Sequence, residues 1–103
     1  MSTVSISQPL QALAAANKVR IDRAELRADL KHQRITLRAA LDDPRARGMT
    51  VSRLLASQHR WGAHRARQAC LTVPVSENRL VEDLTGRQRE ALAQLIEARR
   101  NQE

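Results

Sequence analysis

The chain has 103 residues, the length of one domain with at most a short tail. Its 18 lysine and arginine residues outnumber 11 aspartate and glutamate residues, and a formal net charge of +7 favours a polyanionic partner. Phe and Tyr are absent and Trp occurs once, which argues against single-strand nucleic-acid binders with rows of stacking rings.

The same composition excludes several other classes. One cysteine cannot form an internal disulfide framework, and this fits a reducing cytosol. The chain does not open with a basic region ahead of an apolar run, so we expect no signal peptide. No apolar stretch approaches the roughly 20 residues that span a bilayer, so we expect no membrane association.

The N-terminal third of the chain predicts one long helix. Residues 1–9 are expected to be a flexible N-terminus, in which Ser7 can cap a helix with Pro9 in its first turn. Residues 10–34 are rich in good helix formers and form the predicted long helix. A thin first stripe of apolar positions, expected to pack poorly, precedes a second stripe that begins at Leu26 and Leu30. The first stripe comprises Leu10, Leu13, Asn17, Ile21, Ala24 and Ala28.

Positive charge runs along much of this helix and allows two interpretations. The basic residues either form a solvated face interleaved with acidic residues or contribute to binding a polyanion. The basic residues are Lys18, Arg20, Arg23, Arg27, Lys31 and Arg34, and the acidic ones are Asp22, Glu25 and Asp29.

Residues 35–103 are predicted to form a compact cluster of short helices, since no stretch alternates as a strand does. Threonine or serine caps and a Thr-Gly-Arg-Gln capping box mark the helix starts. The expected helices are 37–41 after Thr36, 51–57 after Thr50, 63–71, a very short one around Arg79 to Val81 after Ser76, and 86–99 after Thr85 with Gln88. Pro44 ends the first of them and opens a basic loop over 44–48. The fold class is therefore all-α.

The turn over residues 59–67, HRWGAHRAR, gathers hydrogen-bond donors where a phosphate can bind. A helix start offers unpaired N–H groups and the positive end of the helix dipole. Gly62 lets the backbone approach an anion, and Arg60, Arg65 and Arg67 add charged donors. The alternative is an arginine-rich, solvated surface turn. Trp61 is either a core plug beneath the turn or a wedge against the minor groove.

No catalytic or metal-binding pattern is present in the sequence. The three histidines lack the spacing of a metal site, so we expect no metal and no other cofactor. Cys70 lies among small apolar residues and is expected to be a buried hydrophobe without a base beside it. We therefore expect a protein that is not an enzyme and has no small-molecule substrate.

The chain resembles the actinobacterial integration host factor family over roughly Arg20 to Ile96. The likeness rests on the order and spacing of five segments, namely RAELRADLKH (23–32), GMTVSRLLAS (48–57), WGAHRARQ (61–68), SENR (76–79) and LTGRQREAL (84–92). The resemblance implies a helix-two-turn-helix module in a nucleoid-associated protein. Such a protein binds double-stranded DNA through phosphates and the minor groove with low sequence specificity, and it can bend or compact the DNA.

The resemblance also implies a location and a set of contact residues. We expect a cytoplasmic, nucleoid-located protein, most simply a monomer, although the sequence does not fix its self-association. The DNA-binding candidates, from the turn chemistry and the family positions together, are Arg60, Trp61, Gly62, His64, Arg65, Arg67, Arg79 and Arg87.

Two departures from the family pattern leave an alternative open. Arg60-Trp61-Gly62-Ala63 replaces the family's Gly-Val-Gly-Lys, and Arg79 alone remains of an arginine cluster that here continues Leu80-Val81-Glu82-Asp83. The two acidic residues would repel a phosphate if they point at it. The chain is therefore alternatively a phage- or mobile-element-type homologue that acts as a protein-interaction module, or as an antagonist of a host nucleoid protein, with weak DNA binding.

Overall fold

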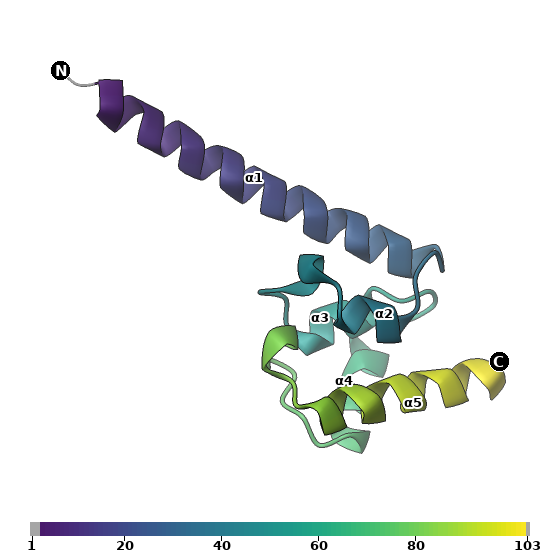
Figure 1. Ribbon diagram of the computed structural model, residues 1–103. Coiled ribbons are helices and arrows are strands. Elements are labelled where there is room, and N and C mark those ends of the chain that lie inside the picture. The colour runs from purple at the N-terminus through teal and green to yellow at the C-terminus, as the bar shows by residue number, and fades with distance from the viewer. Residues whose placement is uncertain (1–2, 103) are drawn as a thin grey trace.

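The computed structural model describes residues 3–102, with side chains for residues 10–99, and contains helices and turns but no strand over that range (Figure 1). The α-helices are α1 (Thr3–Lys31), α2 (Leu37–Leu41), α3 (Val51–Ala56), α4 (Ala63–Thr72) and α5 (Gly86–Gln102). Two 3-10 turns are η1 (Pro44–Ala46) and η2 (Val81–Asp83). The predicted all-α fold, a long helix followed by a cluster of short ones, is confirmed.

Helix α1 begins earlier than the sequence predicts. It starts at Thr3 instead of Leu10, so Ser7 and Pro9 lie inside it and Ser7 is not its cap. Pro9 lacks an N–H and removes one hydrogen bond near the helix start, while good helix formers occupy the turns that follow. The predicted flexible N-terminus, residues 1–9, lies partly outside the described residues, and its backbone is helical from Thr3 onward.

Only the C-terminal half of α1 packs against the cluster, and the N-terminal half projects away from it (Figure 1). Leu26 and Leu30 are buried, whereas Leu10, Leu13 and Ile21 are 57–62% exposed. At 1.5 Å per residue α1 is about 43 Å long, well beyond the width of the cluster it crosses. The second predicted stripe therefore joins the core and the first does not. No helix within residues 3–102 combines the length and apolarity needed to cross a membrane.

The core lies between the end of α1 and the four shorter helices. Helix α3 packs on α4 and α2 packs on α5. Most apolar side chains of the short helices are buried, whereas Leu95 is partly exposed and Leu71 is exposed. The buried set includes Leu37, Leu41, Val51, Leu54, Leu55, Ala66, Ala69, Cys70, Leu84, Leu92 and Ile96. Burial raises the pKa of the Cys70 thiol, which agrees with its expected role as a small hydrophobe.

Three predicted caps form as expected. The hydroxyl of Thr36 accepts from the Ala39 N–H at 3.1 Å, and that of Thr50 accepts from the Arg53 N–H at 3.3 Å. Thr85 and Gln88 form a reciprocal capping box with bonds of 3.0 and 3.1 Å at the start of α5. These caps fix where α2, α3 and α5 begin.

The prediction of a short helix that begins after Ser76 is wrong. The Ser76 hydroxyl caps only a turn, accepting from the Asn78 N–H at 3.3 Å, and the helical turn η2 begins later, at Val81. The reason is a pairing with a distant segment: Val51 donates to the Arg79 carbonyl at 2.8 Å, and Val81 donates to the Met49 carbonyl at 2.9 Å. These bonds keep the chain before Val81 extended.

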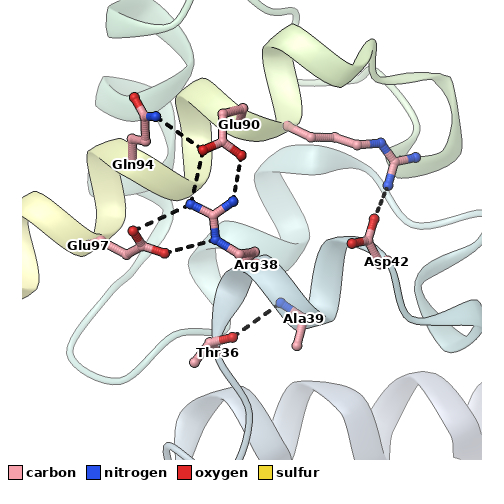
Figure 2. Close-up of polar contacts among 8 residues, drawn as sticks. Thr36, Arg38, Ala39, Asp42, Glu90, Gln94 and Glu97 are labelled. Atoms are coloured by element: carbon pink, nitrogen blue, oxygen red, sulfur yellow. Dashed lines mark hydrogen bonds and ion pairs between the residues drawn. The ribbon is translucent and has the colours of Figure 1, made fainter.

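Charged contacts join α2 to α5 on the outer surface (Figure 2). Arg38 on α2 lies between Glu90 and Glu97 of α5, with its Nε 3.0 Å from Glu97 Oε1. The hydrogen bond from Arg38 holds the pKa of Glu90 below its ordinary value. Arg89 reaches back to the Leu41 carbonyl at 2.7 Å. The Arg38 pairs are solvent-exposed, so we expect them to contribute little to stability.

The loop before α3 is held by what we call the Gly48 clasp, formed by Arg23, Arg47, Gly48 and Glu82. Gly48 has a left-handed φ of +83°, and its N–H donates to Glu82 Oε1 at 2.7 Å. Arg23 Nη2 donates to the Arg47 carbonyl at 3.0 Å. The Gly48 N–H, together with the nearby charges of Arg47 and Arg23, lowers the pKa of Glu82. The clasp ties α1, the 44–48 loop and η2 together.

We expect Gly48→Ala to destabilise the fold by about 1–2 kcal/mol, because an L-residue is strained at a left-handed φ. The added Cβ would also collide with Arg23 Nη2 and disturb its bond to the Arg47 carbonyl. Urea unfolding measures the change. Gly86→Ala is the matched control, since a Cβ there meets open space and the φ is not left-handed. Equal stability of the two variants would contradict the clasp.

The contribution of Glu82 to the free energy of unfolding should decrease as the pH falls. Its pKa is lower in the folded chain than its ordinary value of 4.5, so the charged form stabilises the fold above that value. That contribution is lost as the pH falls through the lowered pKa. We therefore expect wild type to exceed Glu82→Gln in urea stability at pH 7 and the difference to disappear at acid pH. A difference of the same size at both pH values would rule out a role for the charge.

Candidate nucleic-acid interface

The turn between α3 and α4 brings the start of α4 to the surface. The Trp61 N–H donates to the Gln58 carbonyl at 3.0 Å, and Arg60 carries the left-handed φ of +63°. Gly62 itself is extended, at φ −145° and ψ −171°, so the chain reverses at Arg60 and not at the glycine. A Cβ at Gly62 would meet no atom within 4 Å. Gly62 thus leaves the approach to α4 open.

Helix α4 has no side-chain cap, unlike α2 and α3. The Gly62 carbonyl accepts the first helical bond, from the Ala66 N–H at 3.1 Å. The N–H groups of the first turn have no acceptor inside the helix and point outward along its axis. Together with the dipole they form a region of positive potential that attracts an anion.

The Trp61 side chain packs between the core and the turn that joins α3 to α4. Its ring is half-buried and packs against the core, with the Arg65 guanidinium 6.0 Å from the ring centroid and the Arg99 guanidinium 5.7 Å from it. This packing agrees with the interpretation of Trp61 as a core plug beneath the turn. Cation–π attraction from the two guanidinium groups further stabilises the ring in this position. Arg99, which the sequence analysis did not select, comes from the far end of α5 and adds charge beside the start of α4.

The predicted site residues do not all meet at one point. Arg65 and Arg67 are two residues apart on a helix, about 200° around its axis, so they lie on opposite flanks of α4. Arg67 Nε is 3.0 Å from Glu77 Oε1, and Arg79 Nη1 donates to the Asp83 carbonyl at 3.4 Å. Arg67 and Arg79 thus belong to the flank next to residues 77–83.

The remaining DNA-binding candidates also lie in separate places, at the start of α4 and at the start of α5. His64 is exposed in the first turn of α4, so the start of α4 gathers five of the candidates: Arg60, Trp61, Gly62, His64 and Arg65. Arg87 is exposed in the first turn of α5 and lies about 18 Å along that helix from Arg99, at 1.5 Å per residue. Arg87 is therefore remote from the Trp61 ring.

The two acidic residues that follow Arg79, Glu82 and Asp83, have different surroundings. Glu82 is bound into the Gly48 clasp, so its carboxylate is engaged with a backbone N–H. Asp83 is exposed and carries the carbonyl that Arg79 contacts.

Arginine and acidic residues lie on opposite sides of α1. The interpretation of a solvated face, with basic and acidic residues interleaved, did not anticipate this separation. Arg20, Arg23 and Arg27 recur at spacings of three and four residues and share one stripe, which we call the arginine stripe. Asp22, Glu25 and Asp29 have the same spacing but are offset by two residues, about 200° around the helix, and lie on the other side.

Two of the three acidic residues of α1, Asp22 and Asp29, pair with nearby basic side chains. Lys18 pairs with Asp22 at 3.1 Å, and Asp29 pairs with Arg34 at 2.9 Å and with Arg45 at 3.3 Å. The hydrogen bond from Arg34 lowers the pKa of Asp29. The interleaved interpretation holds for Lys18 and Arg34 and is wrong for the arginine stripe.

A long helix that crosses a cluster of short ones, with a basic turn at an uncapped helix start, defines an integration-host-factor-like all-α fold. The solved structure described as sIHF bound to an 8-base-pair palindromic DNA matches with a TM-score of 0.75 and 30% sequence identity. The match covers 80% of this chain and 97% of that one, so the chain belongs to the IHF-like family of sIHF. No protein-family model matches the chain, and no curated protein does.

We expect Trp61→Ala to lower the free energy of unfolding by roughly 2 kcal/mol, because a half-buried ring loses part of the about 3–5 kcal/mol typical of a buried one. Urea unfolding measures the loss. Leu71→Ala is the control, since Leu71 is 72% exposed on the same helix cluster and its truncation should change stability by less than about 0.5 kcal/mol. If Trp61→Ala is as stable as wild type, the ring does not support the turn.

Proposed function

We propose that this chain is a non-enzymatic, nucleoid-associated protein of the integration host factor type that binds double-stranded DNA. The observation that carries the proposal is the family relationship: the chain covers 97% of an sIHF chain that was solved on DNA. The net charge of +7 and the uncapped start of α4 are consistent with that partner.

The start of α4 supplies the first phosphate contact. An outward set of backbone N–H groups and the helix dipole attract the anion, and the open space at Gly62 lets it approach. Arg60, His64 and Arg65 are exposed around this point and add charged or polar donors. Trp61 holds the turn in place from below, and its edge remains partly accessible for contact with the minor groove.

Arg67 and Arg79 supply a second contact on the other flank of α4. The Arg67–Glu77 ion pair is exposed, with side chains 65% and 41% accessible, so exchanging Glu77 for a phosphate costs little. Arg87 extends the basic surface to the start of α5. These contacts reach the DNA backbone, which fixes position and carries little sequence information. The chain would act as a monomer in the nucleoid, and DNA held on separate flanks would bend.

We expect the affinity for duplex DNA to fall linearly with the logarithm of salt concentration in gel-shift titrations. Arg65→Ala combined with Arg67→Ala should reduce the slope by up to about 2, at roughly 0.9 per lost phosphate contact. The control is Lys18→Ala combined with Arg34→Ala, which removes the same charge from groups that pair with the acidic side of α1 and lie outside the proposed contacts. Binding that is absent at low salt, or stronger to single strands than to duplex, would refute the proposal.

A protein-interaction module is the second candidate, and one observation favours it. Leu10, Leu13 and Ile21 share a face of α1 on the N-terminal side of its buried residues and are 62%, 57% and 57% exposed. Under this second function the chain would bind DNA weakly and use α1 to contact a host nucleoid protein. The same titration separates the two, because only the first function requires a steep salt dependence.

A further inference from the structure

Two adjoining hollows lie between α1 and the segment from Gly48 to Trp61. The charged residues that line the first are Arg20, Arg23, Arg27 and Arg53, and those that line the second are Arg27, Lys31 and Arg60. Arg27 lines both, so the two hollows meet at its side chain, and we call the pair the α1–α3 trough. No carboxylate is among the residues that line either hollow.

Within the described residues, the exposed arginines of the trough are not paired with a carboxylate, whereas Arg23 lies near Glu82 in the Gly48 clasp. Burial of Leu26 and Leu30 fixes the rotation of α1, and this turns the arginine stripe toward α3 and the acidic stripe away from it. Arg20 and Arg53 are exposed, and within the described part of the chain neither forms an ion pair with a carboxylate. The Nε atoms of Arg23 and Arg27 are buried without a hydrogen-bond partner.

The trough leads directly to the start of α4. Arg60 and Trp61 line its second hollow and also form the turn that precedes Gly62. Along α1, Lys31 lies about 6 Å from Arg27 and about 16 Å from Arg20 at 1.5 Å per residue. One strand of a duplex carries a phosphate about every 3.4 Å of helix axis, so a groove of this length spans several phosphates.

We propose that the α1–α3 trough binds the phosphate backbone of the duplex that the start of α4 engages, with Arg20, Arg27 and Arg53 as its principal contacts. This inference rests on the proposed function and extends it to a surface outside the helix-two-turn-helix turn. Arg53 is the new residue: it occupies the exposed face of α3 opposite the arginine stripe. The long helix thereby forms one wall of the binding surface.

The test compares two double variants in the duplex titration over salt. Arg20→Ala with Arg53→Ala removes two exposed charges from the trough, and Lys18→Ala with Arg34→Ala removes two that pair with Asp22 and Asp29 on the other side of α1. We expect the trough variant to lower the salt slope by up to about 2 and the control to leave it near the wild-type value. Urea unfolding of both variants confirms that each remains folded.

Each alternative result has a distinct meaning. Equal loss of slope in the two double variants would show an effect of net charge alone and would overturn the trough, as would a wild-type slope in both. In either case the proposed function would stand, because wild type still binds duplex with a steep slope. If wild type ignores duplex at low salt, the proposed function fails and the trough fails with it.

Discussion

Burial of Leu26 and Leu30 is the constraint on which the rest of the structure depends. These two side chains, 0% and 3% exposed, fix both the position and the rotation of α1 on the cluster. Because charges on α1 are sorted by flank, the rotation decides which sign of charge faces α3. A rotation by half a turn would place Asp22 and Asp29 in the trough. The core contact thus sets the electrostatics of a surface that is itself solvent-exposed.

Much of the fold could be predicted from local sequence chemistry. The caps at Thr36, Thr50 and Thr85 form because each bond joins residues three apart, and such contacts depend little on the remaining chain. The turn at Ser76 could not be predicted, since backbone bonds to Met49 and Val51 decide it. The early start of α1 at Thr3 likewise conflicted with strong local signals from Ser7 and Pro9.

The candidate site was only partly predictable. The sequence indicates the basic turn and the small residue at Gly62, but it cannot show that the left-handed residue is Arg60. Arg99 lies far away in sequence and reaches the Trp61 ring only through the packing of α5. The binding of Glu82 to Gly48 is equally non-local. One signal was available: the three-and-four spacing of the arginine stripe, which separates it from the acidic stripe.

The central claim is that the duplex backbone lies on the start of α4 and continues into the α1–α3 trough. Amide chemical-shift mapping of labelled protein during titration with a short duplex tests it most directly. We expect the largest shifts at Gly62 to Arg65 and along the facing sides of α1 and α3, with little change near Arg38 and Glu97. Shifts confined to the Arg38 surface, or no shift at low salt, would contradict it.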